Sequence, residues 1–351
     1  MTWRDGVHLT GTPIWCDARR RRDVCFVSSA DRIGRTGHGQ LIGAPFTLAL
    51  LGASEGGHLA VPLHRRFTLG TLRLELLASG RGPGAAALHV DAGGRSVLYA
   101  GAVRTDVPAA ALALGLEPAG AKACDAVVVA APYGDERHRF PPLADVIAQT
   151  AAWTRAQLAA GRHAALLVDS ALDGLEVAAC LAAEGLPLAG DRSIRELARR
   201  AAELAAAGLL GAVARSLRDA ELRGEPRRDD APGAPSATQQ PSVPAIAAPG
   251  KEPRAVLWAA KDRAGLARTL GDRPAAAALV SGRALDQPHG ADAGFAWASA
   301  AGRAPLLAWI ESTAARAVFV TGPHAESIVA ALGARGKLLG PPRQMTLFEA
   351  R

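Results

Sequence analysis

Hydrophobic and polar residues alternate with a period of two in the first part of the chain. Leu72-Arg73-Leu74-Glu75-Leu76 alternates strictly, which predicts a strand with one buried face. The apolar run at 24–27 is typical of a fully buried strand. Residues 87–90 and 97–99 flank the glycine pair Gly93-Gly94, and this arrangement predicts a β-hairpin.

The period changes near the middle of the chain, where helices begin to alternate with strands. Ser193 is a plausible N-cap for a helix over 194–210, and Glu196 at the third helical position completes a capping box. The other elements expected are strands at 126–129, 164–168, 277–280 and 317–320 and helices at 143–160, 175–184, 304–315 and 324–334. The sequence therefore predicts an α/β protein.

A segment rich in Pro, Ala, Ser and Gly interrupts this order at 222–253. It has almost no aromatic residue, so we expect a disordered linker. Order returns with Ala255-Val256-Leu257-Trp258, and the end of the chain, from Gly340-Pro341-Pro342 onward, looks like a tail.

Length and composition narrow the class of protein. The chain has 351 residues, of which 49% are hydrophobic and 21% charged, which suits two globular domains and excludes a wholly disordered chain. No apolar run reaches the roughly 18 residues that span a bilayer. The N-terminus has no apolar signal-peptide region, and the four cysteines form no disulfide-like pattern. We expect a cytoplasmic, nucleoid-associated protein with no membrane partner.

The net charge of +7 makes nucleic acid the first partner to consider. However, only four of the 40 basic residues are lysines, and alanine is abundant. Such a bias towards arginine and alanine is also what GC-rich coding produces regardless of function. Charge alone therefore leaves nucleic-acid binding open.

A series of short matches, in order along the chain, resembles one nuclease superfamily. The stretch from Val27 to Gly39 ends in Arg35-Thr36-Gly37-His38-Gly39, Tyr133-Gly134 retains the end of an E-x-T-Y-G motif, and Val318-Phe319-Val320-Thr321 fits a final V-F-V-T-H-G strand. These residues resemble the metallo-β-lactamase fold with a β-CASP domain. That superfamily includes ribonuclease J and mRNA 3′-end-processing factors, and the ligase-associated DNA exonuclease-like branch is most similar.

The resemblance implies a metallo-β-lactamase αββα sandwich with an inserted β-CASP-like α/β domain. It divides the chain into a first core part at 1–145, a β-CASP-like domain at 146–273 that contains the linker, a return to the core at 274–340, and a tail at 341–351.

Nucleases of this family hold two zinc or manganese ions with histidine and aspartate ligands, and the metals activate the attacking water. In this chain every one of those positions is substituted, and shifting the alignment by one residue rescues only Asp31. The substituted ligand positions are Ser28, Ala30, Arg32, Ile33, Arg81, Ala102, Ala300 and Gly322.

The nine histidines show no H-x-H or H-x₃-H pair, so we expect no rebuilt metal site and no cofactor. A fixed positive charge at Arg32 and Arg81 disfavours a cation. These two arginines are candidates for phosphate contacts, or alternatively they fill or salt-bridge a decayed cleft.

The tail carries a second resemblance. Gln344-Met345-Thr346-Leu347-Phe348 is similar to the Q-x-x-L-F pentamer that binds the bacterial DNA sliding clamp. Leu347 and Phe348 are adjacent apolar anchors suited to a pocket, and Gln344 would supply hydrogen bonds at its rim. Alternatively, Leu347 and Phe348 pack onto the protein's own core.

Three functions follow. The first is a non-catalytic metallo-β-lactamase/β-CASP paralogue in DNA repair or replication, tethered to the clamp through Gln344–Phe348 and contacting DNA weakly, with other repair proteins as further partners. The second is a divergent metal-dependent DNA or RNA exonuclease or hydrolase with an altered site. The third is a subunit whose basic surface binds another protein rather than DNA.

Overall fold

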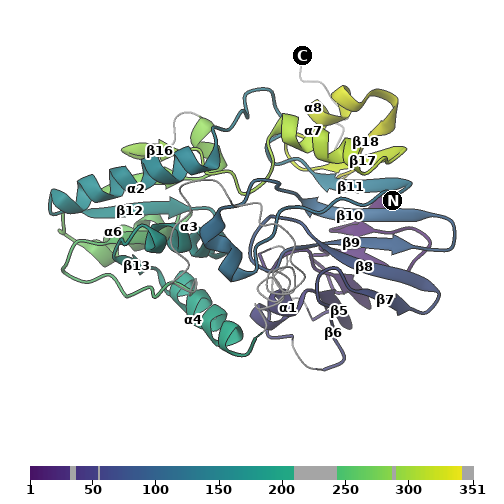
Figure 1. Cartoon of the computed structure of the whole chain (residues 1–351), viewed down its shortest axis with the longest axis horizontal. Helices are drawn as coiled ribbons and strands as arrows, with labels where there is room; N and C mark the ends of the chain where they lie inside the picture. The colour runs from purple at the N-terminus through teal and green to yellow at the C-terminus, as the bar shows by residue number, and fades with distance from the viewer. Residues whose placement is uncertain (32–36, 54–55, 209–242, 287–289, 342–351) are drawn as a thin grey trace, which may run out of the picture.

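The computed structural model describes residues 1–31, 37–53, 56–208, 243–286 and 290–341 (Figure 1). Three sheets form within these ranges, and helices lie between and beside them. The α/β class expected from the sequence is confirmed. No helix in these ranges is long and apolar enough to cross a membrane.

The first sheet has six strands in sequential order. The first three strands pair antiparallel and the rest pair parallel. They are β1 (Thr2–Trp3), β2 (Val7–His8), β3 (Ile14–Cys16), β4 (Val24–Phe26), β5 (Gln40–Gly43) and β6 (Leu59–Ala60).

The second sheet has seven strands in the order β18-β17-β11-β10-β9-β8-β7. The strands are β7 (Arg66–Leu69), β8 (Leu72–Ala78), β9 (Ala86–Asp91), β10 (Ser96–Ala102), β11 (Ala126–Ala130), β17 (Ala317–Thr321) and β18 (Gly336–Leu338). The β9–β10 pair is antiparallel and is the predicted hairpin. Strands β10, β11 and β17 run parallel, so their carboxyl ends meet at one edge.

These two sheets pack face to face. Phe26 and Ile42 of the first sheet share one core cluster with Leu74 and Leu88 of the second. The opposite faces carry helices: α1 (Pro45–Leu50) contributes to the cluster beneath the first sheet, and α7 (Arg303–Ser312) and α8 (Ala325–Leu332) to the cluster on the second. Alternation of period two in the strands accounts for both layers, since each strand buries one side in each cluster.

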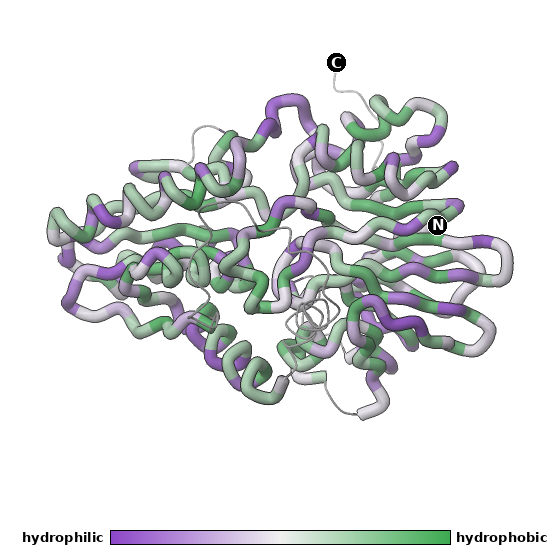
Figure 2. The backbone as a smooth tube through the Cα atoms, in the orientation of Figure 1, coloured by the Kyte–Doolittle hydropathy of each residue, from purple (hydrophilic) through white to green (hydrophobic). Residues whose placement is uncertain are grey.

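The third sheet has five parallel strands in the order β13-β14-β12-β15-β16. They are β12 (His163–Val168), β13 (Leu188–Gly190), β14 (Ala255–Ala259), β15 (Ala275–Val280) and β16 (Ala293–Phe295). All six residues of β12 are buried, as a central parallel strand requires, and Figure 2 draws this strand as largely hydrophobic.

Helices cover both faces of the third sheet. One face packs against α2 (Leu143–Ala159) and α3 (Ala171–Ala183), and the other against α6 (Arg263–Leu270). The chain enters this sheet after β11 and returns to the second sheet at β17, which pairs directly with β11 (Figure 1). In the described part of the chain, three short 3₁₀ helices accompany these elements: η1 (Ala109–Leu114), η2 (Gly282–Leu285) and η3 (Gly333–Arg335).

Helix α4 (Arg192–Ala206) connects the third-sheet unit to the first sheet's helix. Its apolar residues share a cluster with Phe46 and Leu50 of α1. The Arg200 guanidinium donates to the carbonyl oxygens of Leu50 and Ala49 at 3.0 and 3.2 Å. These carbonyls lie at the end of α1, where helix carbonyls lack a partner within the helix.

The predicted N-cap of α4 is wrong. The helix begins two residues earlier than expected, and Asp191, not Ser193, accepts the hydrogen bond from the Ile194 N–H at 2.8 Å. Ser193 instead donates to the same Asp191 carboxylate. A second oxygen of Asp191 accepts from the Ala259 N–H at 3.1 Å, a tertiary contact that helps fix this cap.

Two further expectations differ from the structure. Residues 274–295 were expected to return to the sandwich, but β15 and β16 are hydrogen-bonded into the third sheet. Residues 243–253 of the expected linker are described: Ala247 makes a β-bridge with Ala189, and Ile246 packs against the adjoining core. The remainder of the linker, 222–242, lies outside the described residues.

Candidate functional site

Several positions that the resemblance maps to metal ligands lie together at the carboxyl edge of the parallel strands. Ala102 ends β10, and it shares a small buried cluster with Ala300 and Tyr133. Ser28 follows β4 and lies against Gly101, where an added Cβ would meet the Ser28 Oγ at 3.0 Å. The structure thus brings positions 28, 102 and 300 into one region, although they are far apart in sequence.

None of these positions retains a metal-binding side chain. Ser28 donates its hydroxyl to Asp17 at 2.6 Å, and Ala102 and Ala300 contribute only methyl groups. Gly322 has a φ of +97°, and an added Cβ would lie 3.3 Å from the backbone of Ala131, so a histidine there would be strained. Ala30 packs against the hydrophobic cluster that α3 and α4 share with Phe46 and Leu50 of α1. Arg32 and Ile33 lie outside the described residues.

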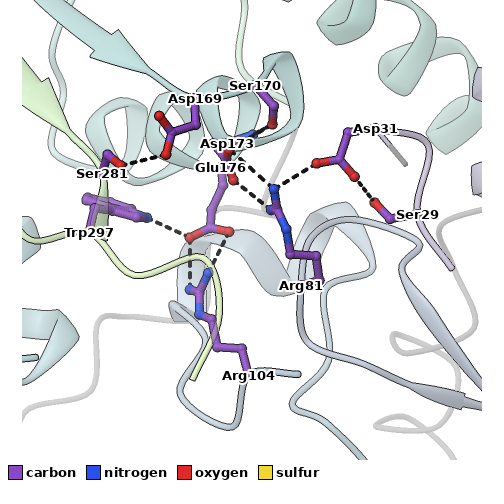
Figure 3. A network of polar contacts seen from close by, with 10 residues as sticks. All are labelled: Ser29, Asp31, Arg81, Arg104, Asp169, Ser170, Asp173, Glu176, Ser281 and Trp297. Atoms are coloured by element: carbon purple, nitrogen blue, oxygen red, sulfur yellow. Dashed lines mark hydrogen bonds and ion pairs between the residues drawn. The ribbon is translucent and has the colours of Figure 1, made fainter. Parts of the chain in front are cut away.

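Arg81 lies between two carboxylates (Figure 3). It comes from the β8–β9 connection, Asp31 from the loop after β4, and Asp173 from the first turn of α3. The guanidinium donates to Asp173 Oδ1 and to Asp31 Oδ2, both at 2.7 Å. Ser29 donates to Asp31 at 2.6 Å, and Ser170, the N-cap of α3, donates to Asp173 at 2.7 Å.

This group is strongly coupled and poorly solvated. The Arg81 side chain is 12% exposed and that of Asp173 is 7% exposed. Burial raises the pKa of the Asp173 carboxyl, and the adjacent Arg81 charge opposes that rise. Burial disfavours the charged form of Arg81, but Asp173 and Asp31 more than offset this and raise the Arg81 pKa. The arginine therefore stays charged, and a phosphate would have to displace a carboxylate to contact it.

A second buried ion pair lies beside the first on the same helix. Arg104, which follows β10, donates to Glu176 of α3 through two nitrogens at 2.8 and 3.0 Å. The indole N–H of Trp297, which follows β16, donates to the same carboxylate at 2.9 Å. The Arg104 and Glu176 side chains are only 3% and 1% exposed. Asp173 and Glu176 are three residues apart, so one face of α3 receives both arginines.

The neighbouring polar contacts continue this pattern. Asp169 follows β12 and accepts a hydrogen bond from Ser281 at 2.5 Å, and Arg283 pairs with its other oxygen. The polar groups in Figure 3 therefore satisfy one another, with arginines opposite carboxylates. Such an arrangement cross-links loops and helices; it does not offer a set of ligands to a metal ion.

The structure also brings together a group that sequence spacing did not reveal. Asp135, His138 and His324 each offer a ligand atom, and these atoms all lie within 4.8 Å of one another. An H-x-H or H-x₃-H pattern could not reveal this pair, because His138 and His324 are far apart in the sequence and meet only in the folded chain. The available signal was Asp135-x-x-His138 in the loop after β11. Burial and the neighbouring His324 lower the pKa of His138, so this ring is neutral at pH 7.

The clamp-like residues Gln344, Met345, Leu347 and Phe348 lie outside the described residues. The sequence matches no protein-family model and no curated protein. The geometry of the fold and the sequence motifs are therefore the basis for a function.

Proposed function

We propose that the protein is a non-catalytic binding protein, derived from a metal-dependent nuclease architecture. More specifically, we propose that it acts in DNA repair or replication, tethered to the bacterial sliding clamp through Gln344–Phe348 and in weak contact with DNA. The observation that carries the non-catalytic part is that Arg81, itself a mapped ligand position, is held between Asp31 and the buried Asp173 instead of leaving a ligand for a metal.

The arrangement of layers supports a relationship to the metallo-β-lactamase/β-CASP superfamily. Two packed sheets have helices outside them, and a parallel-sheet unit is joined between β11 and β17. The proximity of positions 28, 102 and 300 is what a shared ligand site would require of that family. Fold alone does not establish activity, and the residues at these positions argue against hydrolysis.

The absence of usable ligands at the described positions supports the non-catalytic part. Two-metal hydrolysis needs several histidine and carboxylate ligands around two ions that lie about 3.5–4 Å apart. Here Ala102, Ala300 and Gly322 provide none. Of the carboxylates nearby, Asp17 accepts hydrogen bonds from Ser28 and Tyr99, and Asp31 and Asp173 are paired with Arg81. The chain therefore has a binding or scaffolding role in this proposal.

The tail supports the choice of partner. Its two adjacent apolar residues follow a Pro-Pro pair, which restricts the free chain and lowers the entropy lost on docking. A single short peptide of this kind gives only modest affinity. Contact with DNA that threads the clamp raises the effective concentration and strengthens the combined interaction.

The direct test is clamp binding by the full-length chain, measured by calorimetry. Wild type should bind, and the Gln344→Ala/Leu347→Ala/Phe348→Ala variant should lose binding. Thr346→Ala is the matched control, because this position is variable in the Q-x-x-L-F pattern, and it should bind like wild type. Equal binding by all three proteins, or by none, refutes the tether.

A second measurement tests the non-catalytic part. Purified protein with Mn²⁺ or Zn²⁺ should leave single- and double-stranded DNA and RNA intact. Metal-dependent degradation that persists through purification would favour the divergent exonuclease instead.

Binding to DNA should weaken steeply with salt, because phosphate contacts release counterions. Failure to bind DNA at low salt would favour a subunit that contacts only proteins.

A further inference from the structure

The Asp135, His138 and His324 side chains meet where two loops approach closely. Asp135 and His138 belong to the loop after β11, and His324 lies at the N-terminal end of α8. Gly134 permits this approach, because an added Cβ there would lie 2.6 Å from the His324 carbonyl oxygen. The His324 N–H donates to the Ala131 carbonyl at 3.2 Å and holds the loops together. The backbone therefore places the three side chains.

His138 is the feature of this group that requires an explanation. Its side chain is fully buried, and neither ring nitrogen has a hydrogen-bond partner. The ring packs against Tyr133, with centroids 5.4 Å apart, and against His324 at 4.6 Å. A buried polar group without a partner is destabilising, and such a group in a native protein often marks a water or ion site.

A carboxylate of the third-sheet unit completes the surroundings. Asp286 follows η2, and its Oδ1 lies 3.7 Å from His138 Nε2. This oxygen is also buried and lacks a hydrogen-bond partner. On the opposite side, Asp135 Oδ2 lies 2.9 Å from His324 Nδ1. Asp135, His138 and His324 therefore form one compact group, and Asp286 adjoins it at His138.

We propose that Asp135, His138 and His324 bind a zinc-class divalent cation, with Asp286 as the fourth ligand. The two imidazole nitrogens suit zinc rather than calcium or magnesium, which prefer oxygen ligands only. Tetrahedral zinc with bonds near 2.0–2.1 Å separates ligand atoms by about 3.3 Å. The ligand atoms of the three-residue group lie within 4.8 Å of one another, so small side-chain movements bring them to that spacing.

One neighbouring cation competes with the metal. The Arg137 guanidinium lies 3.6 Å from Asp135 Oδ2 and 3.4 Å from Asp286 Oδ1. Its side chain is 58% exposed, so it can turn into solvent when a metal neutralises both carboxylates. The bound ion would join the β11 loop, η2 and α8, and thereby link the third sheet to the second. This site is structural and does not rest on the proposed function.

Zinc binding by the full chain tests this proposal. After chelator treatment and dialysis, the protein should take up one equivalent of Zn²⁺, and its melting temperature should rise. Asp135→Asn and His324→Asn change partly exposed side chains and should keep the fold, as circular dichroism can verify. Each should weaken zinc binding by about 100-fold or more, since both remove a direct ligand. Cobalt substitution should give the visible bands of a tetrahedral nitrogen–oxygen site without thiolate charge transfer.

The matched control is a second histidine–carboxylate pair elsewhere. The exposed His64 has its Nε2 3.0 Å from Glu117 Oε2, and within the described residues this pair belongs to no group of three possible ligands. The His64→Asn/Glu117→Gln variant should bind zinc like wild type. The proposal is overturned if wild type binds no zinc at tens of micromolar, if Asp135→Asn and His324→Asn bind as tightly as wild type, or if cobalt spectra report cysteine ligands. Clamp binding by His324→Asn should be unchanged, which separates this test from that of the tether.

Discussion

Replacing Glu176 by glutamine tests whether the ion pair on α3 holds the third-sheet unit to the packed sheets. The substitution keeps the size of the side chain and an oxygen that can accept from Trp297. It removes the charge opposite Arg104, whose side chain is only 3% exposed. Arg104 would keep its 2.5 Å hydrogen bond to the Asp106 carbonyl and an acceptor at the glutamine oxygen, which corresponds to Glu176 Oε1. It would lose the Oε2 acceptor and the opposite charge.

The expected loss of folding stability follows from the burial of this ion pair. Breaking a buried pair by removing one partner costs about 3–5 kcal/mol, because the remaining charge cannot be solvated. The total stability of a folded domain is about 5–15 kcal/mol, so Glu176→Gln should remove a large share of it. A control at the C-terminal end of the same helix is Glu184→Gln, whose partner Arg155 is 51% exposed. An exposed pair contributes at most about 1 kcal/mol, so this control should change little.

Urea unfolding followed by tryptophan fluorescence and far-ultraviolet circular dichroism measures both variants. The double variant Arg104→Met/Glu176→Gln removes both charges while the glutamine still accepts from Trp297. It should be more stable than Glu176→Gln alone, because no uncompensated charge is buried. A loss below about 1 kcal/mol for Glu176→Gln, or a double variant as unstable as the sum of the single changes, would refute the reasoning.

Three other predictions use the same unfolding assay. Gly80→Ala should destabilise the protein by at least about 2 kcal/mol, because φ is +72° and the new Cβ would lie 1.9 Å from the Arg104 carbonyl oxygen. The control Gly93→Ala, with a φ of +71° but open space around the new Cβ, should cost only about 1 kcal/mol, and equal losses of stability would contradict this prediction. Burial lowers the pKa values of His38, His89 and His163, so the unfolded chain binds more protons than the folded chain below about pH 6.5, and the free energy of unfolding should fall from pH 7 to pH 5. His163→Asn should make this fall with pH smaller, and a free energy of unfolding that does not change with pH would refute the prediction. Arg81→Met should lose about 2–4 kcal/mol yet leave the salt dependence of DNA binding unchanged, whereas a salt slope smaller by about one unit would identify Arg81 as a phosphate contact.

Local pattern was sufficient to predict most elements of the fold. Strict alternation in 72–76 and the glycine pair at 93–94 produce β8 and the β9–β10 hairpin. The cap of α4 could not be predicted in this way, because both Asp191 and Ser193 are good N-caps and a tertiary contact with Ala259 favours Asp191. Membership of β15 in the third sheet depends on pairing with β12, which has no local signature.

The candidate sites depend even more on tertiary placement. The resemblance directed attention to Arg81, but its partner Asp173 lies 92 positions away on α3. Glu176 could not be predicted for the same reason, although an acidic residue within an otherwise apolar predicted helix was a usable signal. The family resemblance itself stays a prediction, since short motifs alone carry it.

The polar face of α3 explains how the layers stay joined where the ligand positions meet. Asp173 and Glu176 project from one face of a helix whose other residues are largely buried and apolar. Arg81 and Arg104 reach that face from the second sheet, one after β8 and the other after β10. In the proposed relationship to metal-dependent nucleases, a shared metal would link these loops through its ligands. Two arginine–carboxylate pairs provide the same kind of link with fixed charges, so the fold can persist there without a metal.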